Sequence, residues 1–257
     1  MPDEKVDAYM DAVIEIFHPG KFHVRDALAA IDKKLPAGID GQLYRLLALR
    51  RYLQKGGAML VANWPWTTAE QKTTYRGVIA DLRKAAKLVK SNFEDANPGL
   101  TLRYTEARDL ERQAQLWVDN ETVKTAGAAL LAMTRRELAG SSYIPNPGAE
   151  AAERFRTYLK GTYLTTDPTN AAPGLSDHGK MQAIDFYVLQ GKKTIASIRT
   201  KTIQREWLNT GLAVKLKDAT KGTPLIGPLR KPYEPWHYSI LAGGGGPTPN
   251  PPPVPID

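Results

Sequence analysis

The chain of 257 residues contains no cysteine. Disulfide bonds are therefore excluded, and so are the closed, cysteine-bearing zinc sites that stabilise many small domains. This absence defines no compartment, because a chain without thiols is compatible with reducing and oxidising surroundings alike. Histidine is scarce as well, with four residues at His18, His23, His178 and His237. A metal site in this chain must therefore combine a few imidazoles with carboxylates.

Long apolar runs are also missing. No stretch approaches the roughly 18 consecutive apolar residues of a membrane-spanning helix, so we expect no membrane span. The first five residues, Met-Pro-Asp-Glu-Lys, carry mixed charge and no apolar run follows them. This pattern predicts that there is no secretory signal peptide. We therefore expect a chain that is synthesised in the cytoplasm and needs another route to any site of action outside it.

The chain is basic but lacks runs of like charge. Its formal net charge is +8, and the basic residues are scattered in doublets such as Arg50-Arg51 and Lys192-Lys193. No nucleic-acid-binding motif accompanies the doublets, so we expect no nucleic acid partner. The charge suits adsorption to an anionic cell wall, and it equally suits simple solubility. Binding of nucleic acid is the alternative that rests on charge alone.

The composition is that of a globular protein, with 42% hydrophobic and 24% charged residues. In the first half, apolar residues recur at helical spacing. These stretches are residues 6–17, 24–35, 43–53, 75–89, 106–118 and 121–138. Trp64-Pro65-Trp66 lies between two of them, either as the cap of a small core or as a platform for a sugar or a partner. We expect residues 1–139 to form a mostly helical region of unknown role.

The second half mixes helix and strand signals. We expect a helix at 149–159, a loop at 165–174, a strand at 182–189, a strand or turn at 194–199, a helix at about 201–218 and a strand at 236–241. The fold class is therefore α+β, with a second domain over residues 140–242. Residues 243–257 are rich in glycine and proline, which predicts a flexible tail. The tail is either a disordered end or a segment that docks on a carrier or a partner.

Four residues in this half have the chemistry of a catalytic metal site. His178, Asp185 and His237 offer two imidazoles and one carboxylate, and Glu234 offers a second carboxylate. Three protein ligands with an open position for water are typical of catalytic zinc, and imidazole and carboxylate both suit Zn²⁺. A carboxylate beside that water can act as the general base. The sequence therefore predicts Zn²⁺ as a cofactor.

The spacing of the first two ligands places a demand on the backbone. His178 and Asp185 are seven residues apart, and on one unbroken strand an odd separation points two side chains to opposite faces. A turn or bulge must therefore lie between them if they share a metal ion. Gly179-Lys180 is where we expect it.

At these residues the chain resembles the zinc D-Ala-D-Ala carboxypeptidases and endopeptidases, which belong to the lysostaphin, D-Ala-D-Ala peptidase and hedgehog fold group. The resemblance rests on Ser176-Asp177-His178, on Ala183-Ile184-Asp185 and on Glu234-Pro235-Trp236-His237. It covers roughly residues 140–242. The resemblance implies a small antiparallel-sheet peptidase domain in which His178, Asp185 and His237 bind zinc and Glu234 is the base. It also implies supporting roles for Ser176, Ala183 and Trp236.

Two positions depart from the pattern of that family. Met181 stands where relatives have a glycine, so the loop between the first two ligands is expected to run differently. Ile144 stands where many relatives have an arginine that helps to hold the substrate. Another arginine would then supply the charge, and the candidates are Arg135, Arg136, Arg154 and Arg156.

We therefore expect a zinc metallopeptidase that cuts peptide bonds of peptidoglycan next to a D-amino acid. Such an enzyme would act in the periplasm or cell wall, as a cell-wall-degrading lysin or as a secreted antibacterial effector. Besides the peptidoglycan peptide, the expected partners are a secretion carrier or an immunity protein. The alternative is a catalytically silent, zinc-containing module that binds peptidoglycan.

Overall fold

The computed structural model describes residues 2–17, 20–37, 41–64, 68–105, 108–140, 143–231 and 233–240. The chain forms two compact units, each made of two separate stretches of sequence. The first unit comprises Met1–Lys72 and Arg108–Lys180, and the second comprises Thr73–Ala107 and Met181–Asp257. The two units therefore alternate along the chain.

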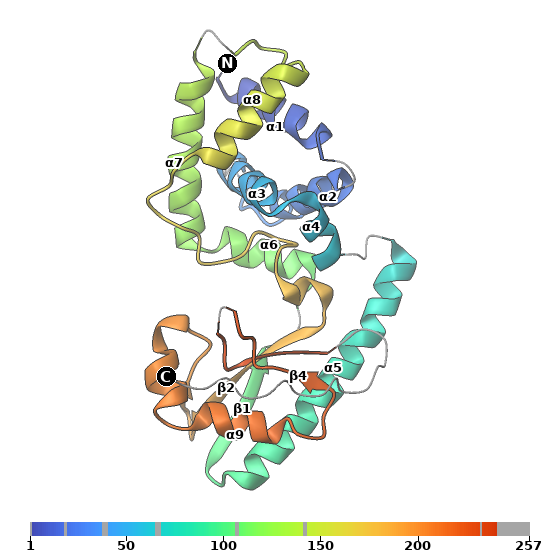
Figure 1. Ribbon diagram of the computed structural model, residues 1–257. Helices are drawn as coiled ribbons and strands as arrows, with labels where there is room; N and C mark the ends of the chain where they lie inside the picture. Colours follow the sequence, from blue (N-terminus) through green and yellow to red (C-terminus); the bar gives the residue numbers. More distant parts are fainter. Residues whose placement is uncertain are drawn as a thin grey trace. The chain divides into compact units, whose positions relative to one another are not determined.

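The first unit is helical (Figure 1). Its helices are α1 (Pro2–Glu15), α2 (Lys21–Asp32), α3 (Gln42–Lys55), α4 (Gly57–Asn63), α6 (Leu110–Val118), α7 (Glu121–Leu138) and α8 (Ala149–Gly161), followed by the short 3₁₀ helix η1 (Asp177–Lys180). Side-chain caps begin two of them, because Asp109 accepts from the backbone of Arg112 and Asn120 accepts from that of Val123. Helix α3 is central, since it contacts α1, α2, α4, α7 and α8.

The second unit packs helices against a small sheet. Its strands are β1 (Leu100–Thr105), β2 (Ala183–Gln190), β3 (Lys193–Ala196), β4 (Leu225–Ile226) and β5 (His237–Ile240). The sheet order is β1-β2-β5-β4, with β3 also paired to β2, and every pairing is antiparallel. The helical elements are α5 (Ala69–Ala96), most of which lies in this unit, the 3₁₀ helix η2 (Thr200–Thr202), the π-helix η3 (Ile203–Leu208) and α9 (Leu212–Ala219).

The two faces of strand β2 have different roles. Ile184, Phe186 and Val188 alternate along it and join one hydrophobic core with residues of α5, η3 and α9. Asp185 and Tyr187 point to the opposite face. The helices thus cover one face of the sheet, and the other face carries the first carboxylate of the predicted metal site.

The expected α+β class is confirmed, because the described residues are mainly helical and contain a small antiparallel sheet. The domain boundary expected between residues 139 and 140 stays a prediction, and the compact units divide the chain at other positions. Helix α8 lies in the first unit because it packs on α1 and α3, and β1 lies in the second because it pairs with β2. The tail, residues 243–257, lies outside the described residues. None of the described helices is both long and apolar enough to cross a bilayer.

Candidate metal centre

Strands β2 and β5 bring two of the expected ligands together. Asp185 and His237 are direct partners in the register of the two antiparallel strands, and directly opposed side chains share a face. The Nδ1 atom of His237 lies 3.0 Å from Oδ1 of Asp185. Both residues are buried, with 4% and 6% of their surfaces exposed. The sheet therefore holds an imidazole and a carboxylate in contact, away from bulk water.

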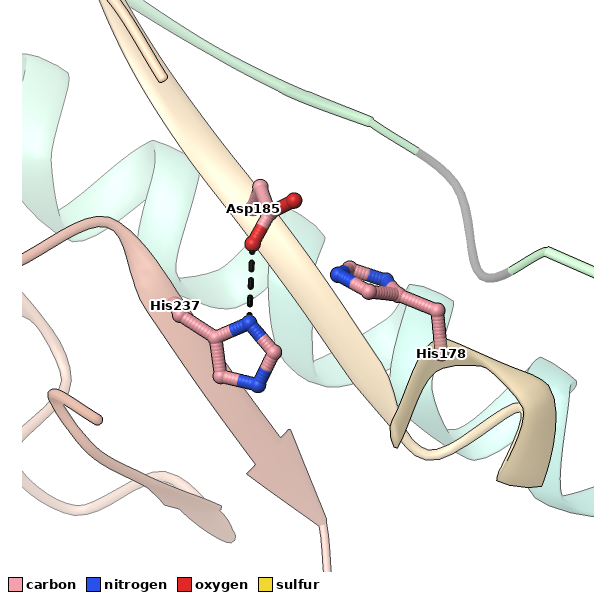
Figure 2. Close-up of side chains that lie close together, drawn as sticks. All are labelled: His178, Asp185 and His237. Atoms are coloured by element: carbon pink, nitrogen blue, oxygen red, sulfur yellow. Dashed lines mark hydrogen bonds and ion pairs between the residues drawn. The ribbon is translucent and has the colours of Figure 1, made fainter. Parts of the chain in front are cut away.

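The third expected ligand comes from the segment just before β2. His178 lies on η1, and Figure 2 shows its ring directed toward the carboxylate of Asp185. The backbone turns at Met181, whose φ of 54° is in the left-handed region. The expected turn between the first two ligands is thus confirmed. Its sharpest point is one residue after Gly179-Lys180.

The three residues could hold a metal ion. One ligand atom from each of His178, Asp185 and His237 lies within 4.8 Å of the other two. Donors on a tetrahedral Zn²⁺ lie about 3.4 Å apart when each bond is about 2.1 Å. The contact between His237 and Asp185 is 3.0 Å, and all three ligand atoms lie within 4.8 Å of one another, close enough for one ion to reach them. Two imidazoles and one carboxylate are also a donor set that zinc accepts.

Glu234 lies beside this group and not within it. The chain reaches β5 through a tight turn in which Glu234 N donates to Leu229 O over 2.9 Å and His237 N donates to Glu234 O over 3.1 Å. The Oε2 atom of Glu234 is 3.8 Å from Nδ1 of His237. Its side chain is 25% exposed, whereas that of Asp185 is 6% exposed. The carboxylate of Asp185 is therefore buried within the group, whereas water can reach the carboxylate of Glu234.

The residues expected to support the site occupy fitting positions. The hydroxyl of Ser176 accepts from the backbone N–H of His178 over 3.3 Å. Ala183 is fully buried at the start of β2. Trp236 is buried next to His237 and packs against Trp207, with 6.1 Å between ring centroids. These contacts set the backbone on either side of the ligands.

The arginines considered from the sequence pair within the helices of the first unit. Arg154 bonds Glu150 and Arg156 bonds Glu153, both on α8. On α7, Arg135 bonds Gln42 of α3, and Arg136 bonds the carbonyl of Ala132. Ile144, at the position where the resemblance implies an arginine, is 55% exposed.

Strand β1 contributes a cation that sequence reasoning missed. Arg103 is the register partner of Tyr187, and Thr105 is the partner of Asp185. Arg103 therefore lies on the same sheet face as Asp185, at a diagonal position where backbones are roughly 7 Å apart. It is exposed. The sequence does carry a signal for this strand, since apolar and polar residues alternate through Leu-Thr-Leu-Arg-Tyr-Thr after an Asn-Pro-Gly turn.

His23 and Trp64 lie outside the group of ligands. His23 is half-buried on α2 and meets the ring of Trp64 edge-on at 5.8 Å. Burial lowers the pKa of His23 more than the neighbouring Asp26 raises it. Trp64 is 3% exposed, which agrees with a place in the core. His18, Pro65 and Trp66 lie outside the described residues.

Comparison with known proteins adds no relative, because no family model, curated protein or solved structure matches this chain. The inference of function therefore depends on the residues of the site.

Proposed function

We propose that the protein is a zinc-dependent peptidase of the cell wall, which hydrolyses peptide bonds of peptidoglycan next to D-amino acids. The observation that carries the proposal is the joint placement of His178, Asp185 and His237 with the carboxylate of Glu234 beside them. A structural zinc site would be closed by a fourth protein ligand, whereas this donor set of three is typical of a site that admits water.

Each residue of the site has a distinct role in the proposed reaction. A bound zinc ion would polarise the scissile carbonyl and lower the pKa of a bound water. Glu234 accepts a proton from the attacking water while the oxygen of that water bonds to the carbonyl carbon. The same carboxyl then donates this proton to the amine that leaves when the C–N bond breaks. Its partial exposure suits a group that exchanges protons, while the burial of Asp185 suits a permanent ligand.

Arg103 is the proposed substrate-binding cation. A stem peptide of peptidoglycan carries carboxylates, and a guanidinium binds a carboxylate through two parallel hydrogen bonds. Arg103 shares a sheet face with Asp185 and is exposed. It therefore replaces the four helical arginines as the candidate for this role.

The choice of peptidoglycan rests on the resemblance to the zinc D-Ala-D-Ala peptidases at Ser176, His178, Ala183, Asp185, Glu234 and His237. The net charge of +8 suits an anionic wall. Action in the periplasm or wall, as a lysin or as a delivered antibacterial effector, belongs to the same proposal. A secretion carrier or an immunity protein would be its protein partner.

Digestion of purified peptidoglycan by the zinc-loaded protein tests the proposal, with released fragments identified by mass spectrometry. We expect loss of a terminal D-Ala or opening of a cross-link. Glu234→Gln should lower the rate by at least about 10²-fold, the scale of a lost general base, and should still bind zinc. Arg103→Ala should lower kcat/KM for the peptide.

The chain offers matched controls for both substitutions. Glu150→Gln changes a carboxylate on α8 that pairs with Arg154, and Arg156→Ala removes an arginine that pairs with Glu153. Both should cut peptidoglycan like the parent. Full activity of Glu234→Gln would overturn the assignment of the base. A zinc-loaded parent that binds peptidoglycan and releases no fragment would instead identify the catalytically silent binding module.

A further inference from the structure

The loop that leads into His178, which includes Pro173, Gly174 and Leu175, is held by three buried polar side chains. Within the first unit, each of these side chains comes from a different helix, and each bonds a different residue of the loop. The three are Tyr52 of α3, Asn63 at the end of α4 and Gln113 of α6. Their targets are the consecutive residues Pro173, Gly174 and Leu175.

The hydrogen bonds are of ordinary length and join side chains to backbone groups of this segment. The hydroxyl of Tyr52 donates to Pro173 O over 2.8 Å. The side-chain oxygen of Gln113 accepts from Gly174 N over 3.0 Å. The side-chain amide of Asn63 donates to Leu175 O over 3.0 Å. Exposure of these three side chains is 4% or less.

Two of the same residues also reach the turn that carries His178, Gln113 with its side chain and Asn63 with its backbone. A Cβ atom added to Gly179 would lie 2.9 Å from Nε2 of Gln113 and 3.1 Å from the backbone oxygen of Asn63. Gly179 N in turn donates to Ser176 O over 2.8 Å. The backbone after His178 is therefore packed directly on the groups that hold the loop before it.

Burying a polar side chain raises the free energy of the folded state unless the side chain forms hydrogen bonds, and for this reason most core positions are apolar. The loop carries few apolar groups of its own. We propose that Tyr52, Asn63 and Gln113 are positioning residues for the metal ligand His178. The inference rests on the metal site of the proposed function, and it concerns binding of the metal ion and not turnover.

Zinc affinity of purified, folded variants tests this role. Tyr52→Phe removes only the hydroxyl and keeps the buried ring, so the hydrogen bond to Pro173 is lost with little change in packing. Gln113→Met is a second, near-isosteric variant, which removes the bond from Gly174 N and also the bond that Gln113 donates to Arg108 O. We expect each to weaken zinc binding about tenfold in competition with a chelator, the lower end of the effect of losing a partner that orients a ligand.

The matched control is Tyr44→Phe. Tyr44 is a buried tyrosine of the same helix, and its hydroxyl makes no hydrogen bond to the loop within the described part of the chain. This variant should bind zinc like the parent. The visible absorption of the cobalt-loaded proteins gives a second readout, because loss of the third ligand alters the cobalt spectrum.

If the three residues only stabilise the fold, Tyr52→Phe and Gln113→Met will unfold at a lower temperature but keep the zinc affinity and the cobalt spectrum of the parent. That result overturns the inference. An equal loss of affinity in Tyr44→Phe also overturns it. A parent that binds no zinc removes both this inference and the proposed function. A parent that binds zinc but cuts no peptidoglycan removes the proposed function alone.

Discussion

Met181 occupies, at the residue scale, a backbone conformation that usually favours glycine. Its φ is 54°, in the left-handed region. The turn before β2 is therefore made with a methionine that is 6% exposed, at the position where the resemblance to the zinc D-Ala-D-Ala peptidases implies a glycine. The side chain contributes packing, and the backbone retains the strain of a left-handed residue.

A pair of substitutions separates these two effects. Met181→Gly and Met181→Ala both remove the buried side chain, and they differ mainly in the cost of the positive φ. We expect the glycine variant to be more stable than the alanine variant by about 1 kcal/mol. Denaturant unfolding of the two proteins measures the difference. An alanine variant as stable as the glycine variant would mean that the turn at residue 181 is not strained.

The residues of the candidate site could be read from the sequence because their chemistry is rare in this chain. Two of only four histidines fall in the pattern with Asp185 and Glu234. The arginine could not be selected in the same way, because arginines are common and their use depends on strand register. Arg103 becomes distinguishable only when β1 pairs with β2.

At the scale of elements, helices with a clear apolar stripe were predicted well, whereas two elements with a weaker signal were missed. Strand β1 was missed although its residues alternate, and α4 was missed because seven residues carry little periodic signal. The expected helix at 201–218 is instead η2, η3 and α9, since Gly211 adopts a φ of 70° between η3 and α9. Strand β5 is short as well, but it was predicted, since the strand expected at 236–241 contains His237–Ile240.

Glu206 joins two of these short elements. Its Oε2 atom accepts from the backbone N–H of Ser197, from the Ser197 hydroxyl and from the Thr202 hydroxyl, and its Oε1 atom accepts from Arg205. Burial alone would raise the pKa of Glu206, but these hydrogen bonds lower it to about 2 from 4.5. The carboxylate thus fixes η3 to the end of β3, and the next residue, Trp207, packs on Trp236.

The depressed pKa predicts the direction of a pH effect. A carboxyl with a lower pKa in the folded state stabilises that state above its unfolded pKa, and this contribution disappears as the pH falls through the folded pKa. Glu206→Gln should therefore cost about 2 kcal/mol at pH 7. The difference from the parent should shrink as the pH falls from 4.5 toward about 2.

Denaturant unfolding of both proteins across this range is the measurement. The control is Glu150→Gln, which removes an exposed carboxylate that makes one ion pair on α8. It should change stability by less than about 1 kcal/mol at any pH. A parent-to-variant difference for Glu206→Gln that stays constant down to pH 2 would contradict the role of the charged carboxylate.

At the scale of the whole molecule, the alternation of the two units along the chain could not be foreseen from local patterns. Periodicity marks helices and strands, but it does not say which ones share a core. Residues 73–107 belong with the strands because α5 covers the sheet and β1 pairs with β2. Helix α8 belongs to the helical unit because it packs on α1 and α3. These are contacts between segments far apart in sequence.

Metal binding gives a measurable property of the whole protein. A ligand that binds only the folded state stabilises it by about 2.7 kcal/mol at a free concentration 100 times its Kd. For a protein of this size, we expect zinc to raise the unfolding temperature by roughly 5–10 °C over the chelator-treated protein.

Asp185→Asn replaces a ligand by a group of the same shape and should abolish most of this response. His23→Ala, which removes a histidine outside the group of ligands, should respond to zinc like the parent even if its own unfolding temperature is lower. An undiminished response in Asp185→Asn would place the bound zinc elsewhere, and the candidate metal centre would then have no role in binding it.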